Sequence, residues 1–179
     1  MRGAVTSKLP PRAFIAFFII RTQIKYNNVM KKIFTETFIE VPFYDLDSMD
    51  VVWHGNYIKY LEVARCDLLS KIGYTYNDMR ADGVAYPVAT MDLKFIKPAV
   101  FSQKLKVVSE IIDYEPALNI KYEIFDARTG EKIFKAKSMQ ICVDLITRES
   151  VYSAPLFFVI KLEAYGLFFI IVNCHYFGN

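Results

Sequence analysis

The chain has few of the residues on which most metal and disulfide sites depend. Its 179 residues include only three cysteines, and no two of these have the spacing of a Cys-x-x-Cys pair. An odd number of thiols without that spacing argues against a disulfide framework and against structural zinc, and is typical of a reducing, cytoplasmic environment. With His54 and His175 as its two histidines, the chain also cannot build an all-histidine metal site.

The sequence also lacks the common motifs for nucleotides and activated serines. It contains no Gly-x-Ser-x-Gly, no Gly-x-Gly-x-x-Gly, no phosphate-binding Gly-rich loop and no His-Glu-x-x-His. The net charge of +3 is small and the lysines and arginines are dispersed, so the electrostatic footprint of a nucleic-acid-binding protein is missing.

The length predicts one main domain with a substantial core, flanked by two apolar ends. We expect residues 1–29 to be an N-terminal extension, either a start assigned too far upstream or a leader, because an ordinary start follows at Met30. The domain itself is expected over 30–150, and 151–179 is an apolar C-terminal extension. Both apolar ends are too short or too interrupted to span a bilayer, so membrane association is not expected, although these ends leave it open.

One long helix and about five strands are predicted. From Asn56 to Gly73 apolar residues recur every three or four positions, which is typical of an amphipathic helix; Asn56 is a suitable N-cap, and Gly73 suits a left-handed C-terminal position. Segments rich in β-branched and aromatic residues predict strands, at 34–43, 86–96, 103–113, 118–126 and 132–145. Strands that follow a single helix favour an α+β domain with an antiparallel sheet. Residues 154–165 could add a terminal helix.

The Asp-Leu-Asp-Ser-Met-Asp run before the helix invites several interpretations. A calcium loop is rejected, since Met49 and Asp50 stand where that loop requires an oxygen ligand and a glycine. A phosphatase motif with Asp45 as nucleophile is weak, because no second acidic motif follows. A carboxylate near a helix N-terminus is, however, a workable catalytic layout, since the free backbone N–H groups can stabilise an oxyanion.

This region resembles the hotdog-fold acyl-CoA thioesterases, and most of all the 4-hydroxybenzoyl-CoA thioesterase and Tol–Pal-associated branch. The similarity covers roughly residues 31–148 and is carried by Asp45, Asp47, Val51, Val52, His54, Asn56, Tyr57, Glu62, Ala64 and Arg65. It departs from the family at Met49 and Asp50, where many members have alanine and glycine. The resemblance implies an α+β hotdog fold in which an antiparallel sheet of about five strands wraps around one long central helix.

The resemblance also implies the roles of the site residues. The key carboxylate is Asp47, as nucleophile or as general base; an ordinary Asp, with a pKa of about 3.9, is ionised at neutral pH. The backbone N–H of His54 or Gly55 would polarise the carbonyl, and the His54 imidazole would orient water or substrate. Substrate contacts are expected from the aromatic, amide and lysine side chains nearby, namely Trp53, Asn56, Tyr57, Lys59, Lys94 and Lys97.

Structural interpretations stand beside these roles. Asp45 is more simply a loop cap, and Asp47 could also be one. Glu62 is an alternative catalytic carboxylate, but we expect it to pair with a base such as Arg65. Trp53 and Tyr57 need no function if they are core aromatics.

The sequence therefore predicts a cytoplasmic hydrolase that cleaves an acyl- or aryl-CoA thioester, with no metal and no cofactor. By resemblance it would form homodimers or homotetramers and would bind no nucleic acid. Two alternatives remain, a hotdog hydratase or dehydratase and a non-catalytic CoA-ester-binding scaffold.

Overall fold

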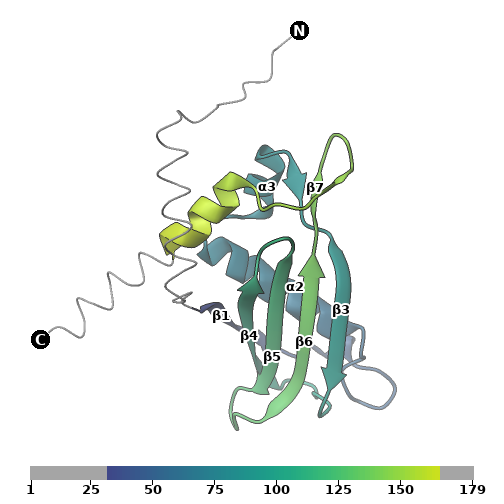
Figure 1. Ribbon diagram of the computed structural model, residues 1–179. Helices are drawn as coiled ribbons and strands as arrows, with labels where there is room; N and C mark the ends of the chain where they lie inside the picture. The colour runs from purple at the N-terminus through teal and green to yellow at the C-terminus, as the bar shows by residue number, and fades with distance from the viewer. Residues whose placement is uncertain (1–31, 166–179) are drawn as a thin grey trace, which may run out of the picture. The chain divides into compact units, whose positions relative to one another are not determined.

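The computed structural model describes residues 32–165 of the chain (Figure 1). The expected extension over 1–29 lies outside the described residues, as does the apolar stretch 166–179.

A five-stranded antiparallel sheet forms the framework (Figure 1). Its strands are β1 (Ile33–Glu40), β4 (Lys104–Asp113), β5 (Leu118–Asp126), β6 (Lys132–Gln140) and β3 (Val88–Phe95), which lie in the order β1-β4-β5-β6-β3. Exposure alternates along β4 and β5, because one face of the sheet is covered and the other is not. The predicted antiparallel sheet and the predicted bounds of β5 are confirmed.

The helix α2 (Asn56–Lys71) covers one face of this sheet and contacts β1 and β4. Its apolar stripe is buried, comprising Tyr57, Tyr60, Leu61, Ala64, Leu68 and Leu69. After the helix, Gly73 has a φ of +69°, the left-handed conformation predicted for it. The predicted N-cap is wrong by one residue: the helix begins at Asn56 and Gly55 is its N-cap. The Asn56 side chain donates to the Asp45 carbonyl.

Shorter elements complete the domain. They are η1 (Phe43–Asp45), α3 (Tyr76–Ala81), β2 (Val84–Ala85), β7 (Cys142–Asp144) and β8 (Ser150–Val151), and the last three form a small sheet in the order β2-β7-β8. The strand predicted over 86–96 is present as β3, with slightly narrower bounds. The continuous strand predicted over 132–145 is wrong in part, because it is divided at Ile141, whose N–H donates to the Pro87 carbonyl where the chain passes from the large sheet to the small one.

A helix over 156–165 lies within the stretch where a terminal helix is predicted. Its Phe158 and Leu162 are buried in the domain core, and the Phe158 ring contacts the rings of Tyr74 and Tyr86. Residues up to 165 thus contribute to the same core as the sheet. Among the described residues, no helix is both long and apolar enough to cross a membrane.

Candidate active site

A tight loop joins η1 to the start of α2. Leu46 and Val52 face each other in an antiparallel bridge, and the Asp47 N–H donates to the Val51 carbonyl at 2.8 Å. The loop is fixed from outside by the Val52 N–H, which donates to the Ala99 carbonyl at 2.8 Å. Asp47 is therefore held on a short, hydrogen-bonded loop directly before the helix.

The Asp47 carboxylate has one oxygen engaged and one available. Its Oδ1 accepts the Met49 N–H at 2.8 Å, so Asp47 does cap the turn of this loop. Within residues 32–165 the other oxygen has no hydrogen-bond or ion-pair partner. Because the turn fixes the orientation of the carboxylate, the remaining oxygen is presented at a defined place.

Backbone N–H groups are also available at the helix start. The Asn56 N–H donates to the Trp53 carbonyl at 2.8 Å. The N–H groups of His54 and Gly55 bond to no residue in the described part of the chain. They lie at the N-terminus of a 16-residue helix, where the helix dipole favours negative charge.

The Trp53 ring lies very close to Gly55. A Cβ atom at position 55 would lie 2.1 Å from the Trp53 ring, well inside any real contact. The ring also lies beside that of His54, with 4.8 Å between centroids. The indole therefore covers the helix start, while His54 and Trp53 remain exposed to solvent.

Asp45 lies deeper than a loop cap would. Its side chain is buried, and its carboxylate accepts the Lys59 Nζ at 2.6 Å and the Tyr60 hydroxyl at 2.8 Å. Its carbonyl accepts the Trp53 N–H at 3.0 Å and the Asn56 side-chain amide at 2.8 Å. Asp45 thus ties the loop to the start of α2. The prediction of a simple loop cap is wrong, because the carboxylate is buried and bonded to helix residues.

Burial raises the pKa of the Tyr60 hydroxyl, and the neighbouring Asp45 carboxylate raises it further. Tyr60 therefore remains a neutral donor that holds the Asp45 carboxylate in place. Tyr60 thus helps to position the loop that carries Asp47. The sequence predicted only that Tyr60 lies on the apolar face of the helix.

Tyr57 lies in the core. Its ring stacks on Phe134, with 4.9 Å between centroids, and its hydroxyl accepts the Ala99 N–H at 3.0 Å. It therefore braces the turn that holds the Asp47 loop.

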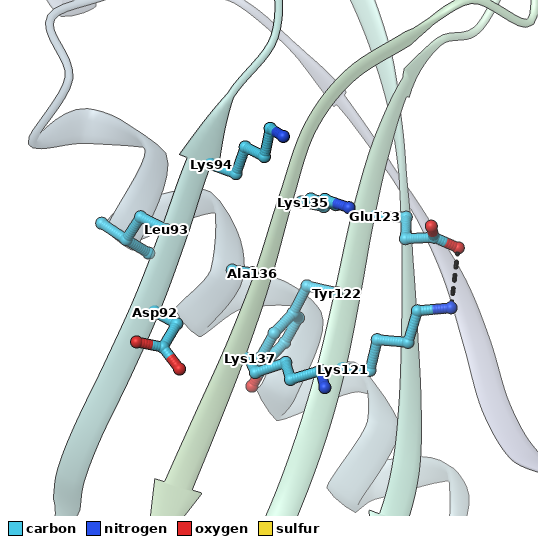
Figure 2. A pocket seen from close by; sticks show the side chains of 9 residues that line it. All are labelled: Asp92, Leu93, Lys94, Lys121, Tyr122, Glu123, Lys135, Ala136 and Lys137. Atoms are coloured by element: carbon cyan, nitrogen blue, oxygen red, sulfur yellow. Dashed lines mark ion pairs between the residues drawn. The ribbon is translucent and has the colours of Figure 1, made fainter.

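The three lysines suggested for phosphate contacts lie in different surroundings. Lys59 pairs with Asp45, and Lys97 pairs with Glu131. Lys94 lies on the face of the sheet opposite α2 (Figure 2). The structure does not bring these three together.

Glu62 makes the contacts expected of a structural carboxylate. It accepts the Arg65 guanidinium at 2.5 Å and the Tyr76 hydroxyl at 2.7 Å. Burial raises the pKa of this carboxyl, but the bonds from Arg65 and Tyr76 outweigh burial and lower it overall. Both Glu62 oxygens are therefore engaged, and one of them makes the predicted pairing with Arg65. Over residues 32–165, no group of three or more His, Cys, Asp or Glu could hold a metal ion.

An antiparallel sheet around one helix, with a carboxylate loop tied to the helix start, defines a hotdog α+β domain. The sequence profile of the Thioesterase-like superfamily matches residues 41–157, and the chain belongs to this superfamily. The predicted family and the predicted fold are confirmed. The expected branch within the family stays a prediction.

Known relatives agree with this assignment. The Bacillus subtilis protein named "Putative acyl-CoA thioesterase YneP" is 36% identical over 107 residues, which cover 59% of this chain and 77% of the relative. The long-chain acyl-CoA thioesterase FadM of Escherichia coli is 27% identical over 116 residues, or 64% and 87% of the two chains. The crystal structure of DHNA-CoA thioesterase from Staphylococcus aureus matches with a TM-score of 0.67 and 31% identity, covering 78% of this chain and 93% of that one.

Proposed function

We propose that this chain is a thioester hydrolase that cleaves an acyl- or aryl-CoA into a free acid and CoA. The observation that carries the proposal is the Asp47 carboxylate, on a loop tied to the start of α2, which has one oxygen that no residue between 32 and 165 engages. The names of the relatives from Bacillus subtilis, Escherichia coli and Staphylococcus aureus support the same substrate class.

In the general-base route, the free oxygen of Asp47 removes a proton from water as the water oxygen attacks the thioester carbonyl carbon. The C–S bond then breaks, and the proton passes to the departing CoA sulfur. In the nucleophilic route, the same oxygen attacks the carbonyl carbon and the C–S bond breaks, so that CoA leaves as a thiolate and Asp47 is acylated. Water then hydrolyses the mixed anhydride, which regenerates the Asp47 carboxylate, releases the acid and supplies the proton that the CoA sulfur takes up. The products are the same, so the two routes differ only in whether Asp47 is acylated.

In both routes the carbonyl oxygen becomes negatively charged. We assign its stabilisation to the N–H groups of His54 and Gly55, which are unengaged within the described residues. Losing one such donor typically costs on the order of 100-fold in rate. We assign the His54 imidazole, which is exposed beside them, to orienting water or substrate.

Exposed apolar side chains around the loop suit the acyl group. Phe43 and Tyr44 on η1 are each 72% exposed, Met49 in the loop is 73% exposed and Trp53 is 48% exposed. Large apolar side chains left in solvent mark a binding surface. We propose that these exposed side chains on η1 and the loop contact the acyl or aryl group.

We also propose that the protein forms homodimers in the cytoplasm. The edge strand β3 pairs with β6 on one side, and no described strand pairs with its other side. Because β3 is the last strand of the sheet, its outer edge offers unpaired backbone groups that the same edge of a second copy could cover. The cysteine usage described above supports the compartment.

The test is thiol release from short-chain, long-chain and aromatic acyl-CoAs by the purified full-length chain. We expect turnover on at least one class, with free acid and CoA as the products. Binding of acyl-CoA without turnover on any of them would contradict the proposal and favour a CoA-ester-binding scaffold. Addition or loss of water at the acyl chain with the thioester intact would indicate a hydratase or dehydratase.

A further inference from the structure

The face of the sheet opposite α2 carries an open pocket of about 460 Å³ (Figure 2). Strands β3, β5 and β6 form it, and none of its lining residues comes from α2 or from the Asp47 loop. Its charged lining consists of Asp92, Lys94, Lys121, Glu123, Lys135 and Lys137.

Lysines lie opposite lysines in this pocket. Across the β3–β6 pair, Lys94 faces Lys135, and across the β5–β6 pair, Lys121 faces Lys137. Like charges directly opposite each other destabilise a sheet. These side chains point away from the core (Figure 2), so packing does not explain them.

The two carboxylates of the pocket also lie opposite lysines, with Asp92 facing Lys137 and Glu123 facing Lys135. Two carboxylates against four lysines still leave the lining with a net positive charge. Glu123 accepts Lys121 Nζ at 3.1 Å and Lys132 Nζ at 2.6 Å, so a lysine outside the pocket shares its charge. Lys94, Lys135 and Lys137 form no ion pair with any residue between 32 and 165. The pocket therefore presents three unpaired ammonium groups from two adjacent strands.

We propose that this pocket binds a compact phosphate-bearing molecule with two or more negative charges. Each Lys ammonium is a point charge with three donors that suits a phosphate oxygen. Two phosphates, or a pyrophosphate, would separate the facing ammonium groups and remove their repulsion. The phosphates could belong to CoA itself or to an independent phosphorylated metabolite, and the proposal does not depend on thioester hydrolysis.

The experiment is a calorimetric titration of the full-length chain with pyrophosphate, at low ionic strength and at roughly 0.15 M, where screening of exposed charges is strong. The test variant is Lys135→Gln/Lys137→Gln. The matched control is Lys104→Gln/Lys106→Gln, which removes the same charge from β4 of the same sheet, outside the pocket.

We expect saturable binding of one pyrophosphate per chain, weakened at least about tenfold in the test variant and little changed in the control. Absence of saturable binding by the parent chain, or equal weakening in both variants, would overturn the proposal. A competition titration with CoA then separates the sources, because displacement of pyrophosphate by CoA identifies CoA's phosphates as ligands. No displacement identifies an independent phosphorylated molecule, and both results keep the site. Thiol release measured on the same samples reports separately on the proposed hydrolase.

Discussion

The buried Asp45 carboxylate accepts the Tyr60 hydroxyl at 2.8 Å, which joins the loop before α2 to the second turn of that helix. The bond is local in space but spans 15 residues, and it holds the backbone that carries the proposed catalytic group. Tyr60 is buried, and its hydroxyl is the donor to Asp45 Oδ2, while Lys59 donates to Oδ1, so loss of the hydroxyl leaves one buried carboxylate oxygen without this donor.

Tyr60→Phe is therefore expected to lower the free energy of unfolding by about 1–3 kcal/mol, because it removes a donor from a buried carboxylate. Denaturant unfolding followed by circular dichroism measures this change. Tyr44→Phe is the matched control: that ring is 72% exposed, and its loss of a hydroxyl should change stability by less than about 0.5 kcal/mol. Equal effects of the two substitutions would show that the bond from Tyr60 to Asp45 does not contribute to the free energy of unfolding.

A methyl group at position 55 has no room while Trp53 lies over the helix start. Gly55→Ala should cost about 1–3 kcal/mol of stability through overpacking. In a Trp53→Ala background the same change should cost much less, so that a double-mutant cycle gives a clear coupling energy. Additive costs in the cycle would contradict the inferred clash.

The loop depends on a left-handed residue at Asp50, whose φ is +59°. Asp50→Val should destabilise the chain by about 1–2 kcal/mol, because a branched side chain is strained in that conformation. Asp50→Gly should not, since glycine adopts it freely, as the glycine of many family members at this position suggests. Thermal unfolding of both variants checks this, and equal stability of the two would show that the backbone at 50 is not strained.

Stability should fall at alkaline pH. Burial raises the pKa of Tyr60, Tyr74 and Tyr86 above the ordinary value of 10.0, so these hydroxyls stay neutral in the folded chain when those of the unfolded chain ionise. Below about pH 10 the two states hold the same protons on these groups, and no effect is expected. Above it, the free energy of unfolding should decrease steadily with pH.

Unfolding midpoints at about pH 9 and about pH 11 measure this decrease. Tyr86→Phe should reduce the slope, because one group no longer ionises in the unfolded chain. An unchanged slope in that variant, or a stability that rises with pH, would contradict the assignment.

Local patterns were sufficient for much of the fold. The period of three to four residues identified α2, and alternation identified β5, since each pattern reports a single covered face. The division of the strand at Ile141 was not predictable, because a distant partner, Pro87, creates it.

The candidate site shows the same limit. Asp47 and the helix start were recognisable from spacing and resemblance, but the burial of Asp45 was not. It depends on Tyr60 and Lys59 folding back over the loop, and no local signal separates such a carboxylate from a surface cap.

The most direct measurement of the central claim is kcat/KM for thiol release by Asp47→Asn, compared with Glu62→Gln and with the parent chain on its best acyl-CoA. Asparagine keeps an oxygen for the Met49 N–H, so the loop should stay folded by circular dichroism. We expect Asp47→Asn to reduce kcat/KM by about 100- to 10,000-fold and Glu62→Gln to leave it nearly unchanged. Full activity in a folded Asp47→Asn protein, or its loss in Glu62→Gln alone, would contradict the assignment of catalysis to Asp47.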